Sequence, residues 1–184
     1  MKKLRPGADN RNLDAGFTLV ELIAVLVIAG ILAAFALPRF FNKSSYDLSG
    51  YFNQAQSVVR YGQKVAIAQG TNVYVRLNGT SVALCYDAAC ASPVTSASGS
   101  NSGNAATLAA CGNNKTWACE ASGAGVTYIA TPYTLFYYSP QGKPYLAGDS
   151  EPISNFNSLL TITLSSGSAT LSFFVEQETG YVHH

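Results

Sequence analysis

The chain has 184 residues, which is enough for one domain and a separate anchoring segment. Charged residues make up only 11% of it, a low share for a soluble protein, and the formal net charge is +1. Residues 1–16 hold four basic and two acidic side chains, so seven basic and eight acidic side chains remain in the rest of the chain. A body so close to neutral argues against general binding to nucleic acid.

The first predicted element is an apolar helix that starts at Phe17. Residues 17–37 are apolar or small apart from Thr18 and Glu21, and as a helix they would span roughly 30 Å, the thickness of a bilayer core. A carboxylate is costly inside such a run, so Glu21 marks a functional position. The run contains no cation. The nearest cation would be an α-amino group at Phe17 if the chain were cut after Gly16, and this amine would be in reach of Glu21 of the same helix or of a neighbouring copy.

The residues Gly16-Phe17-Thr18-Leu19-Val20-Glu21 resemble the cleavage and methylation signal of type IV pilins and type II secretion pseudopilins. The resemblance implies that a prepilin peptidase cuts between Gly16 and Phe17 and that Phe17 is then N-methylated. It also implies that Glu21 forms an assembly salt bridge with the N-terminus of an adjacent subunit. Pro38 lies where this family often has a helix-kinking proline.

This resemblance predicts three parts: a cleaved leader at 1–16, a transmembrane and assembly helix at 17–38, and a periplasmic or extracellular globular domain at 39–184. The basic leader before an apolar run predicts an inner-membrane protein with a cytoplasmic N-terminus. Such a subunit later moves from the inner membrane into a pilus or pseudopilus filament.

The helix is expected to continue to about residue 70, bent at Pro38 because proline lacks a backbone donor. Beyond the proline, apolar residues recur at spacings of four and three, which predicts a buried face made of Leu48, Phe52, Ala55, Val59, Gly62 and Ala66. Gly70 is the expected stop of this helix.

After Gly70 the pattern changes to alternating, β-rich stretches. Residues 72–77 and 81–86 flank Asn78-Gly79, a strong two-residue hairpin signal. Further strands are expected at 126–130, 133–138, 159–164 and 169–175. One helix followed by about six strands predicts an α+β fold, with the second half of the helix packed on an antiparallel sheet as in pilins.

All four cysteines lie in the predicted exterior domain: Cys85, Cys90, Cys111 and Cys119. An even number in an exported domain favours disulfides, and the neighbouring pairs come first among three possible connectivities. A four-thiolate zinc site is the alternative, although zinc ligands are usually closer in sequence. The cysteines flank region 87–125, which is rich in small polar residues and long enough to be a mobile or ligand-binding loop. Its Trp117 either packs on a disulfide or is an exposed contact residue.

Few other residues suggest chemistry. Asp149, Ser150 and Glu151 form either a solvated turn or a weak calcium site, and the terminal His183 and His184 receive no role. The sequence has no evident Ser-His-acid set, phosphate-binding glycine loop or metal-ligand cluster. We therefore expect no enzyme activity, no cofactor and no metal.

Three stretches of the body resemble the minor-pilin branch that includes general secretion protein H and FimT: 56–70, 136–144 and 178–183. Within this branch the chain is most similar to the minor pilin of the mannose-sensitive haemagglutinin (MSHA) pilus. The resemblance implies a structural subunit that initiates or caps a filament. Its expected partners are a prepilin peptidase, other pilin or pseudopilin subunits, an inner-membrane assembly platform and the lipid bilayer. The alternatives are a type II secretion minor pseudopilin, an adhesive or DNA-uptake pilin acting through loop 87–125, and a major pilin.

Overall fold

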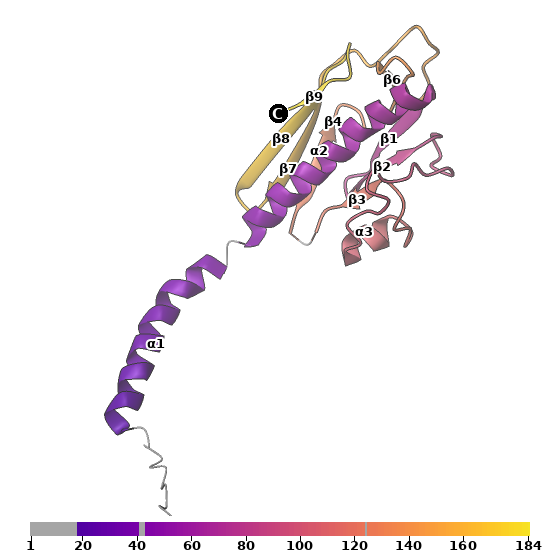
Figure 1. Cartoon of the computed structure of the whole chain (residues 1–184). Coiled ribbons are helices and arrows are strands. Elements are labelled where there is room, and N and C mark those ends of the chain that lie inside the picture. Colours follow the sequence, from indigo (N-terminus) through magenta and orange to yellow (C-terminus); the bar gives the residue numbers. More distant parts are fainter. Residues whose placement is uncertain (1–17, 41–42, 124) are drawn as a thin grey trace, which may run out of the picture. The chain divides into compact units, whose positions relative to one another are not determined.

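Figure 1 shows the computed structural model of the chain, which describes residues 18–40, 43–123 and 125–184. Within these ranges, the side chains of residues 34–40 and 43–45 are not described. The chain divides into two compact units, residues 1–41 and 42–184. The first unit contributes the described helix α1, and the second is a helix-and-sheet domain.

Helix α1 (Leu19–Phe40) forms where the sequence is almost entirely apolar. The helix includes Pro38, and the bend expected there stays a prediction. The large apolar side chains between positions 19 and 32 are each between 52% and 73% exposed and surround the helix. The apolar surface of this helix is therefore largely exposed. In the described residues no helix has the length and hydropathy that a membrane crossing requires.

The second unit begins with α2 (Lys43–Gln69), which buries the predicted face: Leu48, Phe52, Ala55, Val59 and Ala66. Gly62 lies on the same face, where an added Cβ would come within 2.8 Å of Leu84 Cδ2. Gly70 ends the helix in the left-handed region with φ +62°, and Thr71 N donates to Ala66 O at 3.3 Å. The sequence predicted one helix from 17 to about 70. In this stretch the structure describes α1 and α2, and residues 41–42 between them lie outside the described ranges.

Two antiparallel sheets pack against α2 (Figure 1). The first has the order β3 (Cys119–Ala121), β2 (Ser81–Cys85), β1 (Val73–Leu77), β5 (Leu135–Tyr138) and β6 (Pro144–Leu146). The second has the order β4 (Thr127–Thr131), β7 (Leu160–Ser166), β8 (Ala169–Val175) and β9 (Val182–His183). A short helix, α3 (Ala105–Ala110), lies between β2 and β3 in sequence. The α+β class is confirmed, but the described strands form two sheets where about six strands in one sheet were expected.

The β1–β2 hairpin is confirmed, with its turn shifted by one residue. Leu77 pairs with Val82, so the central turn residues are Gly79 and Thr80 and not Asn78 and Gly79. Gly79 takes φ +84°, which suits glycine at the first central position of a two-residue hairpin turn. The Asn78 side-chain oxygen accepts a hydrogen bond from Thr80 N at 3.0 Å, which stabilises the turn.

The C-terminal segment, residues 176–183, is held in the fold by hydrogen bonds to several elements. Its strand β9 pairs with β8, and α2 holds it through Arg60, whose Nε and Nη2 donate to Val182 O at 3.1 and 2.9 Å. Gln63 Nε2 donates to Thr179 O at 2.7 Å, and the buried Tyr138 hydroxyl donates to Gly180 O at 3.2 Å. The segment therefore connects α2, the first sheet and the second sheet.

Candidate functional site

The predicted processing residues lie at the start of the first unit. Gly16 and Phe17 fall outside the described residues, and the description begins with Thr18. Thr18 precedes the first turn of α1 and Glu21 lies within that turn. Thr18 N and Oγ1 donate to Glu21 Oε2 at 3.1 and 3.0 Å, and Glu21 N donates to Thr18 Oγ1 at 3.2 Å. This reciprocal arrangement is a capping box, in which the side chains of both residues satisfy free backbone donors.

The capping box changes the electrostatic surroundings of Glu21. Its carboxylate lies at the positive end of the α1 dipole and accepts two hydrogen bonds from Thr18. The sequence analysis sought a partner for Glu21 only among cations and did not consider the hydrogen bonds from Thr18. The Thr-x-x-Glu spacing before an apolar run is a known capping signal and could have revealed the interaction.

A second distinctive region is the insertion, which we define as residues 86–118 between β2 and β3. Disulfides join Cys85 to Cys90 and Cys111 to Cys119, the neighbouring pairs that came first in the sequence analysis. Inside the insertion, Val94 N donates to Leu84 O at 3.0 Å, so its chain extends the hydrogen bonding of β2. The insertion is therefore largely ordered by β2 and by disulfides at both of its ends.

Trp117 covers the second disulfide. It packs on a small buried cluster formed by Ala83, Cys111 and Cys119, and its Nε1 donates to Leu84 O at 2.7 Å. Of the two roles considered from the sequence, the structure shows the packed one. Trp117 thus ties the exit of the insertion to β2.

Glu120 is a buried acid that the sequence analysis did not single out. Its side chain belongs to a residue only 8% exposed, and it accepts from Ser102 N at 2.7 Å, Ser102 Oγ at 2.6 Å and Thr107 Oγ1 at 3.1 Å. These bonds compensate the carboxylate for lost water and fix the start of α3 against β3. One acid beside Cys119 in a charge-poor stretch formed no pattern from which this role could be predicted.

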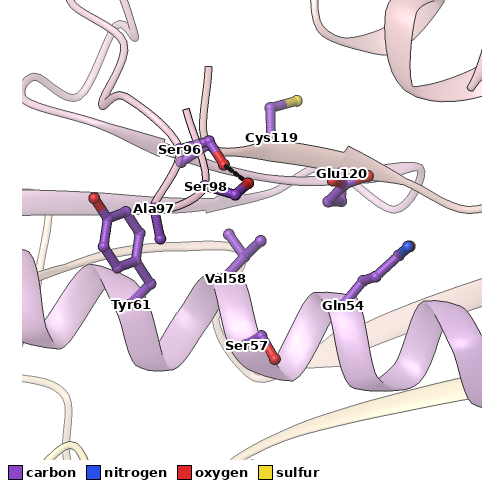
Figure 2. A pocket seen from close by; sticks show the side chains of 10 residues that line it. Gln54, Ser57, Val58, Tyr61, Ser96, Ala97, Ser98, Cys119 and Glu120 are labelled. Atoms are coloured by element: carbon purple, nitrogen blue, oxygen red, sulfur yellow. Dashed lines mark hydrogen bonds between the residues drawn. The ribbon is translucent and has the colours of Figure 1, made fainter. Parts of the chain in front are cut away.

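A cleft of about 210 Å³ lies between α2 and the insertion. Figure 2 shows the side chains that line it. Val58 and Tyr61 point from α2 toward residues 96–98 of the insertion, and Glu120 lies on the strand beside them. The lining is mostly small or apolar, and its hydroxyl and carboxylate groups do not form a nucleophile–base arrangement. The cleft is thus suited to contact and not to bond-breaking chemistry.

The remaining candidates of the sequence analysis have local structural partners. Asp149 Oδ2 accepts from Leu146 N at 2.7 Å and from Asn155 N at 2.9 Å, which closes the loop that was considered for calcium. His183 Nε2 lies 2.9 Å from Glu176 Oε1 within the C-terminal segment. In the ranges described, no group of three His, Cys, Asp or Glu residues could hold a metal ion.

The comparisons with known proteins agree with the N-terminal motif. The model of the prokaryotic N-terminal methylation motif matches residues 11–37. The type IV narrow pilus major component PilA5 of Thermus thermophilus is 41% identical over 63 residues, which cover 32% of this chain. The match spans half the length of that relative. Two crystal forms of the type IV minor pilin FimU of Pseudomonas aeruginosa are similar over 76% and 74% of this chain and 88% and 90% of theirs, with TM-scores of 0.48 and 0.46 at 10% identity.

The matched motif, residues 11–37, includes most of helix α1, so the N-terminal part of the chain is similar to that of type IV pilins.

Proposed function

We propose that this chain is a minor pilin that initiates or caps a type IV pilus of the MSHA type. The observation that carries the proposal is the combination in α1 of an uncovered apolar surface with one acid, Glu21, held at its start. Such a helix needs either lipid or other helices around it. The body stretches that resemble the minor-pilin branch support the finer assignment.

In this proposal the leader is cut between Gly16 and Phe17, and residues 17–38 anchor the chain in the inner membrane with the N-terminus at the cytoplasmic side. The globular domain then lies in the periplasm. The assembly platform moves the subunit into the filament, where α1 exchanges lipid for neighbouring helices.

Thr18 and Glu21 would act at the moment of this exchange. In the free subunit, Thr18 satisfies the carboxylate of Glu21 from within the helix. In the filament, the methylated amino group of Phe17 on the adjacent subunit replaces or joins Thr18. Burying the amine and the carboxylate together costs much less than burying either one alone. The pairing therefore favours the position of a subunit in the filament at which its carboxylate meets the amine of its neighbour.

Two other candidates remain. One is an adhesive or DNA-uptake pilin that acts through the insertion, and the other is a type II secretion minor pseudopilin. The insertion lies at the surface and is held by two disulfides, which favours the binding role. Deleting residues 92–102 would not separate binding from assembly, because Val94 is buried and Ser102 holds Glu120. Changing the exposed Lys115 to Ala leaves these contacts in place and is therefore the cleaner test of binding by the insertion.

The deciding experiment is quantitative mass spectrometry of sheared filaments from cells that carry wild-type chain or Glu21→Ala. We expect trace amounts of wild-type chain that starts at methylated Phe17. The Glu21→Ala chain should still be processed, but its amount in filaments should fall at least about tenfold, because a buried unpaired amine costs several kcal/mol. Glu151→Ala, which removes an exposed acid of the globular domain, is the matched control.

Normal incorporation of Glu21→Ala would refute the pairing mechanism. A dominant wild-type signal would make the chain a major pilin, and processed chain confined to the inner membrane would point to a secretion pseudopilin.

A further inference from the structure

The second sheet has an outer face, on the side away from α2. Helix α2 contacts β7 and β8 on the opposite side, where the alternate residues Leu160, Ile162 and Leu164 of β7 are buried (Figure 1). Successive strand residues point to opposite faces, so the strand pairing places the intervening residues of these strands side by side. They form three rows, which we call the hydroxyl face: Thr127, Ser165 and Thr170; Ile129, Thr163 and Ser172; Thr131, Thr161, Phe174 and His183.

The hydroxyl face offers many hydrogen-bonding groups and contains no Lys, Arg, Asp or Glu. Apart from Ile129, Phe174 and His183, its residues are all Ser or Thr. Thr163 Oγ1 and Ser172 Oγ lie 2.9 Å apart and pair with each other. Among the described residues, the structure gives the other side-chain hydroxyls of this face no partner. Each of them can donate one hydrogen bond and accept others, at spacings of about 4.8 Å across the strands and about 6.8 Å along them.

Aromatic rings adjoin these hydroxyls at the end of the face formed by β8 and β9. The ring centroids of Phe174 and His183 lie 5.4 Å apart, and those of His183 and Tyr181 lie 5.6 Å apart with planes only 13° from parallel. Tyr181 is 60% exposed, although it is a large aromatic residue. The face of an aromatic ring carries partial negative charge and attracts C–H groups such as those on the flat side of a sugar ring.

The chemistry of the hydroxyl face is unsuited to most other classes of ligand. Nucleic acids and anionic lipid headgroups are bound through Lys and Arg, which these rows do not contain. A stable protein partner needs an apolar interface core, and Ile129 and Phe174 are the only large apolar residues of the three rows. A neutral polymer with many hydroxyl groups meets neither obstacle, because it has no charge to compensate and can exchange hydrogen bonds with every row.

We propose that the hydroxyl face binds an extended, neutral polysaccharide made of β-1,4-linked hexoses. Such a chain is a flat ribbon with hydroxyl groups along its edges and C–H groups on its flat sides, so it can lie on a surface of short side chains. In this arrangement Tyr181 stacks on one sugar ring, and the rows of Thr and Ser hydroxyls bond the sugars that follow. This binding role goes beyond filament assembly and does not depend on it, because the face belongs to the globular domain alone.

Binding of soluble oligosaccharides to the purified full-length chain tests the proposal. The detergent is an amine oxide, which has no sugar headgroup that could compete. Cellohexaose and chitohexaose are the β-1,4-linked probes, and maltohexaose, which has the glucose units of cellohexaose in a coiled α-1,4 linkage, is the matched control. In titration calorimetry, at least one β-1,4-linked probe should bind saturably and at least about ten times more tightly than maltohexaose. Absence of binding by both probes, or equal affinity for maltohexaose, would overturn the proposal.

Variants of the chain locate the binding to this face. Tyr181→Ala should weaken binding about tenfold, and Thr163→Val, which keeps the side-chain shape but removes a hydroxyl, about fivefold. The matched controls are Tyr46→Ala, since Tyr46 is 78% exposed on α2, and Thr95→Val in the insertion. Both controls should bind as the unchanged chain does, and equal urea midpoints would show that all four variants fold. Loss of affinity in the controls but not in the face variants would place the site elsewhere and refute the assignment. A filament role can stand or fall without changing this result, because the titration uses no filaments.

Discussion

Replacing Gly180 by alanine should destabilise the globular domain strongly, because this glycine lies where the C-terminal segment meets α2. Gly180 has φ +66°, and an added Cβ would lie 2.6 Å from Gly142 O, 2.6 Å from Tyr138 Cε1 and 2.9 Å from Gln63 Nε2. Real Cβ atoms do not approach other atoms so closely, and two of these neighbours hold the segment by hydrogen bonds. The segment must therefore move away, and the buried Tyr138 hydroxyl loses its acceptor.

Two contributions determine the loss of stability in Gly180→Ala: the strained backbone at this position and the lost hydrogen bonds of the C-terminal segment. Left-handed backbone costs a non-glycine residue about 1–2 kcal/mol. An orphaned buried hydroxyl and a lost side-chain hydrogen bond add about 2–3 kcal/mol. Gly167→Ala is the matched control, because Gly167 has φ +59° but nothing within 4 Å of the added Cβ. Only the backbone contribution applies to this control.

The assay is urea unfolding of the full-length chain in mild detergent with the disulfides intact. Trp117, the single tryptophan, reports the transition from its packed site. With a urea dependence of about 1–3 kcal/mol per molar, Gly180→Ala should lower the midpoint by about 1 M more than Gly167→Ala does. Equal midpoints for the two variants would refute the reasoning that the C-terminal segment is a tightly packed connector.

Two further predictions concern the core. Replacing both Cys111 and Cys119 by serine should lower the free energy of unfolding by about 2–3 kcal/mol and shift Trp117 emission to the red; unchanged emission would contradict the packing described. Burial raises the pKa of Tyr128 to about 12, so the folded domain favours the neutral phenol; stability should be full below about pH 10 and fall as pH rises toward 12. Tyr128→Phe should weaken this alkaline loss, and an unchanged pH profile would contradict it.

The sequence by itself determined the features that depend on neighbouring residues. The Gly16 to Glu21 motif, the buried face of α2 and the stop at Gly70 are local patterns, because helix periodicity and a left-handed glycine act over one or two turns. The capping box of Thr18 and Glu21 is equally local, and it was missed only because partners for Glu21 were sought among cations.

Only the tertiary structure decided the features that join distant parts of the chain. The division into two sheets and the pairing of β9 with β8 depend on which strands pair with each other when they pack against α2. Glu120 becomes a buried connector because folding brings Ser102 and Thr107 to it, and the cleft between α2 and the insertion exists because the insertion folds back beside the helix. Such contacts arise when several elements bury apolar surface together, and no short stretch of sequence contains the information on where its distant neighbours will lie.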